Sequence, residues 1–132
     1  MAEENKPSAR FEQGMATRRS VLGADYVDAR VASTTPFNEP YQTLITEAAW
    51  GHVWSRDNWT KRERSIVTIA LLAALGHYEE MVMHINATRN TGATEDDIRE
   101  ALLHVAIYAG VPNANHAMKL AAEALSSLKE AK

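Results

Sequence analysis

The feature that most limits the fold of this chain is an uncharged, largely apolar run over residues 65–78. Thr60 and Glu63 stand before it at the spacing of a capping box, in which two side chains satisfy backbone N–H groups at the start of a helix. The run is shorter than the roughly 20 residues that a membrane-spanning helix needs. Because its apolar residues fall on every side of a helix, we expect a central helix that is buried all round.

Helical patterns continue on both sides of this segment, separated by glycine, proline or short polar residues. The expected helices cover residues 9–21, 24–32, 39–55, 60–75, 77–90, 94–109 and 113–129. No segment alternates polar and apolar residues between turn signals as a surface strand would. The sequence therefore predicts an all-α fold, a compact bundle of about six helices. We expect a single domain over residues 8–132, preceded by a flexible tail of residues 1–7.

The composition narrows the classes of function. The chain has 132 residues, of which 45% are hydrophobic and 23% charged, as in an ordinary globular domain. Its formal charge of −3 offers no general attraction to nucleic acid or to an anionic membrane, so neither is an expected partner. The sequence contains no cysteine, which excludes disulfides, thiolate metal ligands and thiol nucleophiles. The polar start of the chain predicts a cytoplasmic protein. An all-apolar helix in so small a domain favours a homo-oligomer.

His77, Glu80 and His84 occupy one stripe of an expected helix, at positions i, i+3 and i+7. Glu80 can hold one nitrogen of His84 in a fixed tautomer, which leaves the other nitrogen to give or take a proton. A carboxylate with two imidazoles is also a ligand set for zinc or iron. A solvated stripe with an incidental pair on the helix surface is about as frequent. For His77 we expect this last interpretation.

His104 and Tyr108 are one helical turn apart, close to the turn at Gly110 and Pro112. Such a pair is suited to line a pocket. A buried histidine and tyrosine that only satisfy each other are at least as common.

Trp50 and Trp54 share a helix face, with Arg56 nearby. Core packing or an oligomer contact would explain them, since tryptophan and arginine are enriched at interfaces. They would equally form a wall and a carboxylate clamp for a small planar anion. Arg64, at the start of the apolar run, is our candidate for a second clamp.

Several short motifs together resemble one known family. They are Trp50-Gly51, Trp54-Ser55-Arg56, residues 64–70, residues 73–76, Glu80 with His84, and residues 108–112, joined nearer the start by Gly14, Arg18 and residues 21–23. Over nearly the whole chain these motifs resemble the 4-carboxymuconolactone decarboxylase family. The resemblance implies an all-helical fold of the alkylhydroperoxidase type, assembled as trimers or hexamers. The related peroxidases carry a Cys-x-x-Cys pair that would fall at His77 and Glu80, so the absence of cysteine excludes their chemistry.

The resemblance also implies an activity. It is that of a carboxy-lyase, without cofactor or metal, which converts 4-carboxymuconolactone to β-ketoadipate enol-lactone and carbon dioxide in the β-ketoadipate pathway of aromatic-compound degradation. Such a substrate carries its own electron sink, because the lactone carbonyl accepts the electrons of the broken bond.

Each step of that reaction has a candidate residue. Arg56 and Arg64 would clamp the retained carboxylate. Trp50 and Trp54 would form an apolar wall. His104 or Tyr108 would donate to the developing oxyanion, and the pair Glu80 and His84 would deliver the proton, roles that two of these residues can exchange.

Two alternatives remain at this point. One is a related decarboxylase or lactone-processing enzyme acting on another small unsaturated acid. The other is a non-catalytic metal-binding or oligomeric module in which the stripe from His77 to His84 holds an ion.

Overall fold

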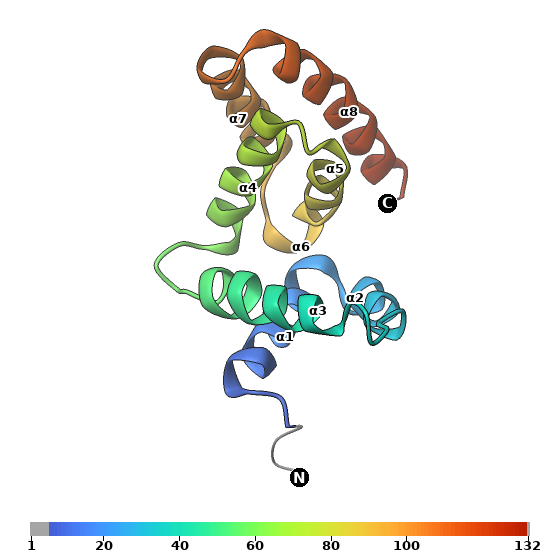
Figure 1. Cartoon of the computed structure of the whole chain (residues 1–132). Coiled ribbons are helices and arrows are strands. Elements are labelled where there is room, and N and C mark those ends of the chain that lie inside the picture. The colour runs from blue at the N-terminus through green and yellow to red at the C-terminus, as the bar shows by residue number, and fades with distance from the viewer. Residues whose placement is uncertain (1–5, 132) are drawn as a thin grey trace. The chain divides into compact units, whose positions relative to one another are not determined.

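The computed structural model describes residues 6–131, which form eight α-helices and one π-helix without any strand (Figure 1). In chain order these are α1 (Ala9–Leu22), α2 (Ala24–Ala32), α3 (Glu39–Ile45), η2 (Thr46–Trp54), α4 (Lys61–Leu75), α5 (Tyr78–Asn86), α6 (Thr88–Thr91), α7 (Glu95–Tyr108) and α8 (Val111–Glu130). The predicted all-α class is confirmed. The chain divides into two compact units, residues 1–58 and 59–132, and each is described by itself. The single domain over 8–132 stays a prediction, and residues 1–5 of the predicted tail lie outside the described residues.

In the first unit, α1 and η2 pack backbone against backbone. A Cβ atom added at Gly14 would lie 2.1 Å from the carbonyl oxygen of Thr46, and one added at Gly51 would lie 2.6 Å from that of Arg10. Atoms in van der Waals contact stay well beyond such distances, so both positions require glycine. The Nη1 atom of Arg10 also donates a hydrogen bond to the carbonyl oxygen of Gly51, at 3.1 Å.

The helix expected over residues 39–55 is present, but its hydrogen bonding changes at Thr46. The α-helical turns of α3 give way to η2, a π-helix, and π turns are rare and occur often at functional sites. The hydroxyl of Ser55 donates to the carbonyl oxygen of Trp50 at 2.7 Å, and it lies 2.7 Å from the hydroxyl of Thr17 on α1. The predicted helical segment is thus confirmed, and the change in its hydrogen bonding was not predicted.

In the second unit, local signals place the helix ends as expected. The capping box predicted for Thr60 and Glu63 forms at the start of α4, and Thr94 and Asp97 form a second one at the start of α7. Gly76 ends α4 in the left-handed conformation, with φ of 77°. The helix expected over residues 77–90 is interrupted at Ala87, which separates α5 from α6.

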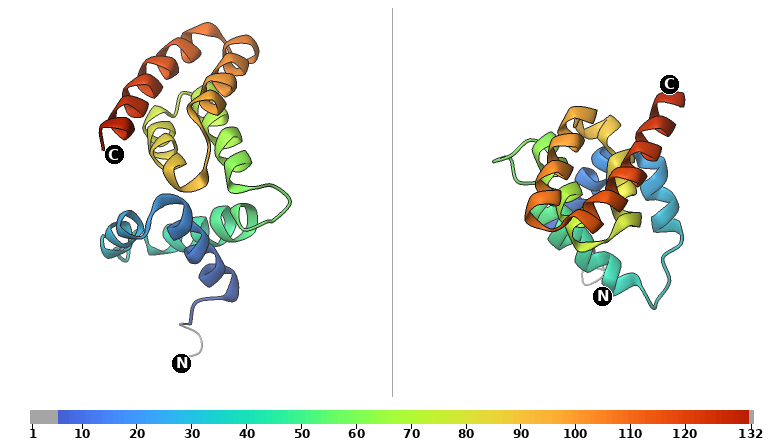
Figure 2. Two further views of the ribbon diagram at one scale, coloured as in Figure 1. Left: turned by 180° about the vertical axis from the view of Figure 1, so that it is seen from behind. Right: turned by 90° about the horizontal axis from the view of Figure 1, so that it is seen from above.

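The core of the second unit lies among α4, α5, α7 and α8, with α5 placed between α4 and α8 (Figures 1 and 2). Bulky side chains come from the first three of these helices, whereas α8 contributes a row of alanines that lets its backbone approach closely. The core residues are Ile69, Ala73, Met81, Ile85, Ile98, Leu102, Val105, Ala114, Ala117, Ala121 and Ala124.

The expectation that the apolar run would be buried all round was wrong. On α4 only Ser65, Ile69 and Ala73 are buried, while Leu71 is 56% and Leu75 67% exposed. The reason is that helices of this unit cover α4 on one side only. Large apolar side chains are also exposed on α7 and at the start of α8. We use the name α4/α7 face for the seven exposed apolar residues of these three helices, which are Val67, Leu71, Leu75, Leu103, Ile107, Tyr108 and Val111. Within residues 6–131, no helix combines the length and apolar character that crossing a membrane requires.

Candidate active site

His84 is the one histidine that the structure buries among residues 6–131. It lies on α5, 7% exposed, and burial lowers the pKa of its imidazole to about 4, because the charged form loses its hydration. Glu80, one turn earlier on the same helix, is exposed. At neutral pH His84 is therefore a neutral imidazole, able to donate a hydrogen bond from one nitrogen and to accept one at the other.

The predicted stripe on α5 does not hold together as a ligand set. His77 precedes the helix as its N-cap residue and is exposed, whereas His84 faces the core. Among the described residues, no three histidine, aspartate or glutamate side chains are grouped as metal ligands would be. The metal-binding interpretation of His77, Glu80 and His84 thus has no geometric support.

His104 and Tyr108 lie side by side on α7, as their spacing predicted. Their rings are stacked, with centroids 6.0 Å apart and planes at 15°, and Tyr108 is 84% exposed. His104 also lines a depression of about 330 Å³ together with residues of α4 and α7. The other lining residues are Ile66, Val67, Ala70, Leu71, Asp97, Glu100 and Ala101. This pair is accessible on the α4/α7 face, not satisfied inside a core.

Arg64 and Arg62 have different surroundings at the start of α4. Arg64 is half-buried, and its guanidinium lies over the ring of Trp59, 5.9 Å from the centroid. Arg62 forms two hydrogen bonds to the carboxylate of Asp97, at 2.7 and 2.6 Å. This pairing and the hydrogen bonds from Thr94 lower the pKa of Asp97 to about 2. Arg64, which lies nearer the apolar run, stays our candidate for a clamp.

Trp50, Trp54 and Arg56 belong to the first unit. Both tryptophans are buried on η2, with ring centroids 5.2 Å apart and planes tilted by 35°. Arg56 is exposed just beyond the end of η2. The two indoles are therefore neighbours, as their shared helix face predicted, and their burial also fits the core-packing interpretation. The other five predicted site residues, Arg64, Glu80, His84, His104 and Tyr108, belong to the second unit.

Arg18 is a buried cation to which the sequence reasoning gave no role. It is 5% exposed on α1, and burial lowers the pKa of its guanidinium, assisted by the charge of Arg30. The sequence pattern that could have indicated its burial is its position four residues after Gly14 and three before Val21. This spacing places all three residues on one buried face of α1.

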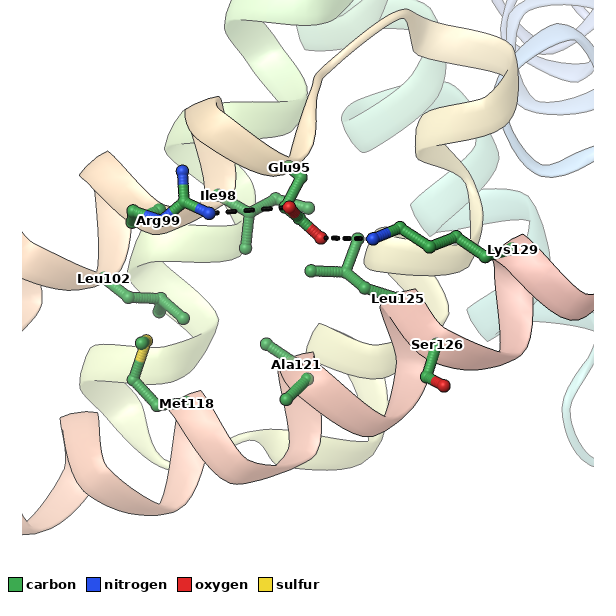
Figure 3. Close-up of a pocket in the computed structure, with 10 residues that line it drawn as sticks. Glu95, Ile98, Arg99, Leu102, Met118, Ala121, Leu125, Ser126 and Lys129 are labelled. Atoms are coloured by element: carbon green, nitrogen blue, oxygen red, sulfur yellow. Dashed lines mark hydrogen bonds and ion pairs between the residues drawn. The ribbon is translucent and has the colours of Figure 1, made fainter.

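A separate pocket of about 290 Å³ lies between α7 and α8 (Figure 3). Glu95 at its edge pairs with Arg99 at 3.4 Å and with Lys129 at 3.1 Å, while Leu102, Met118 and Leu125 line its apolar side. None of the predicted site residues lines it. The Glu95–Arg99 pair lies within α7, and the exposed Glu95–Lys129 pair ties α7 to α8 only weakly. We assign the pocket no catalytic role.

Comparison with known proteins shows which class of enzymes this chain resembles and which family it belongs to. The chain is 42% identical to the 4-carboxymuconolactone decarboxylase of Acinetobacter baylyi over 119 residues, which cover 90% of this chain and 89% of that protein. It is also 42% identical to the nitrosuccinic acid decarboxylase npaB of Metarhizium robertsii over 108 residues, covering 82% of this chain and 76% of that protein. Both relatives are decarboxylases by name.

The family model of the carboxymuconolactone decarboxylase family matches residues 39–123. The chain belongs to this family, and the predicted resemblance is confirmed. The matched range includes every predicted site residue and excludes α1 and α2.

Proposed function

We propose that this protein is a carboxy-lyase that converts 4-carboxymuconolactone to the enol-lactone and carbon dioxide. The observation that carries the proposal is the near full-length match to a relative of that name. The family match over residues 39–123 supports it independently.

The proposed reaction requires only three contributions from the protein, because the substrate provides the rest. As the bond to the departing carboxylate breaks, its electrons pass through the ring double bond into the lactone carbonyl, and the resulting dienolate is protonated beside that carbonyl. The substrate therefore supplies the electron sink for which other decarboxylases use a cofactor. The protein must hold the retained carboxylate, stabilise the oxyanion and provide one proton.

The burial of His84 helps to decide which residue stabilises the oxyanion and which residue donates the proton. To protonate an imidazole whose pKa is about 4 would cost about 4 kcal/mol at pH 7. A neutral imidazole donates a hydrogen bond to an oxyanion without this cost. We therefore propose that His84 stabilises the oxyanion, and that the proton comes from His104, Tyr108 or Glu80, which are all exposed.

The proposed roles in carboxylate binding and in the apolar wall follow from the chemistry of the side chains. We propose that Arg56 and Arg64 bind carboxylate, because guanidinium groups match it in geometry and charge. We propose that the apolar indoles of Trp50 and Trp54 form the wall beside the departing group, which becomes uncharged.

A second candidate function is the decarboxylation of another small acid. It is favoured by the equal identity to the nitrosuccinic acid decarboxylase. Nitrosuccinic acid is likewise a dicarboxylic acid in which one carboxylate departs beside an electron sink, here the nitro group, while a carboxymethyl arm is retained. Both acids are thus dianions that carry their own electron sink, and this is the substrate class that we propose.

The test is an assay of the purified chain with both acids in parallel, in heavy water. We expect carbon dioxide release from 4-carboxymuconolactone well above the spontaneous rate, with one deuterium beside the product carbonyl. Release from nitrosuccinic acid alone would replace the lactone assignment by the second candidate. Loss of activity after exhaustive chelation, with recovery on adding a metal, would contradict the cofactor-free mechanism.

We also propose that the protein is a cytoplasmic homo-oligomer, a trimer or a hexamer. The α4/α7 face supports self-association, because its seven large apolar side chains are exposed and extensive exposed apolar surface often marks an interface. Sedimentation is expected to give three or six times the chain mass of 14.6 kDa. A single species of 14.6 kDa at micromolar concentration would contradict this proposal.

A further inference from the structure

Arg18 is the buried cation that lacks a compensating charge among residues 6–131. Its Nε atom is covered and has no hydrogen-bond partner there. Its Nη1 atom donates only to neutral oxygens, the amide oxygen of Gln42 at 3.4 Å and the hydroxyl of Thr46 at 3.5 Å. Both distances are long for N–H···O hydrogen bonds. A guanidinium can donate five hydrogen bonds, so most of its capacity is unused.

The groups around Arg18 add positive and not negative charge. Arg30 on α2 lies near enough to lower the pKa of Arg18, in addition to the effect of burial, and the phenol of Tyr26 acts weakly in the other direction. The acidic residue nearest in sequence to Arg30, Asp28, is already paired with Arg19. A buried charge without a partner is costly, so a negatively charged group bound beside Arg18 would lower this cost.

We propose that the Arg18 guanidinium binds a carboxylate of the substrate. This inference rests on the proposed function in one respect, the substrate class, and adds a residue outside the range matched by the family model. The retained carboxylate is the better occupant. A charge-assisted bond to the departing carboxylate would stabilise the ground state and so slow its loss.

The placement of Arg18 suits such a role. It follows Gly14 by one turn, at the crossing where the backbones of α1 and η2 meet. Its partner Thr46 begins η2, which also carries Trp50 one turn later. Arg18 is thus carried by a helix that packs closely against the helix of Trp50, and side chains placed on helices are positioned more precisely than those on loops.

The test uses succinate, an unreactive dicarboxylate, as a probe of the full chain. We expect succinate to raise the melting temperature of the wild-type protein and of Arg19→Gln, the matched control on the exposed side of α1. The shift should disappear in Arg18→Met and shrink in Arg18→Lys, which keeps the charge but loses the two-pronged geometry. An equal shift in Arg18→Met and wild type would overturn the proposal.

Kinetics separate a binding role from a structural one. For the turned-over acid, Arg18→Met should raise KM by roughly 10- to 100-fold with a smaller change in kcat. Without succinate its melting temperature should equal or exceed that of the wild type, because an uncompensated charge has been removed. A lower melting temperature or a smaller oligomer, with the succinate shift retained, would assign Arg18 to structure or to a subunit contact and refute our inference.

The two proposals fail in different ways. An Arg18-dependent succinate shift in a protein that does not decarboxylate the lactone would support the carboxylate site and reject the lactone assignment. Normal turnover and KM in a folded Arg18→Met variant would support the lactone assignment and reject the carboxylate site at Arg18.

Discussion

His84→Ala is expected to lower the turnover of 4-carboxymuconolactone by about 10²- to 10³-fold, the usual effect of removing one oxyanion donor. The reason is that the buried, neutral imidazole is our proposed donor to the charge that develops on the lactone. Steady-state kinetics measure the change, and circular dichroism should show unchanged helical content. His84→Gln keeps an N–H donor of similar reach and should retain part of the activity.

His77→Ala is the matched control for this experiment. His77 precedes α5 and is exposed, so its removal should leave turnover nearly unchanged. Equal losses in the two alanine variants would mean that the roles of the stripe have been misassigned. The pH profile gives a second readout. A neutral donor predicts that titration of His84 leaves turnover unchanged between pH 6 and 8, whereas an imidazolium acid would lose activity steadily as the pH rises.

The second large effect concerns stability in acid. The pKa of His84 is about 4 in the folded protein, against an ordinary value of 6.5. Between these values the unfolded chain binds a proton that the folded chain excludes, so the stabilisation is fully present above pH 6.5 and is lost as the pH falls towards 4. The shift corresponds to a loss of about 3 kcal/mol in the free energy of unfolding.

Urea unfolding at pH 7.5 and pH 4.5 measures this loss. Compared with the wild type, His84→Gln should lose less stability on acidification, by most of that amount, because it has no imidazole to protonate. His77→Gln should behave as the wild type does. If the wild type and His84→Gln lose the same stability between the two pH values, the imidazole is not held neutral by burial.

Local signals in the sequence predicted the helix ends well. The capping boxes at Thr60 and Thr94 and the left-handed turns at Gly76 and Gly92 depend on residues within one turn of each other, so they can be read without knowing the fold. The family was also predictable, because its motifs are short and lie in order along the chain.

Features that depend on distant contacts escaped the sequence reasoning. The π-helical turns of η2 occur where its backbone meets α1 at Gly14, more than thirty residues earlier. The exposure of Leu71 depends on which helices cover α4, and apolar periodicity alone does not show this. The spacing of Arg18 from Gly14 and Val21 places the three on one helix face, but it does not show that another helix covers the guanidinium.

The glycine crossing of α1 and η2 also limits how such an enzyme can diversify. Where two helices touch through side chains, a swap of one residue for a larger or smaller one tilts them by degrees, and evolution can retune a binding surface gradually. At Gly14 and Gly51 there is no side chain to exchange, and even a methyl group would collide with a carbonyl oxygen. We therefore expect the angle between these helices to tolerate little change. Preference for one acid over another must be adjusted by replacing the side chains that the two helices carry.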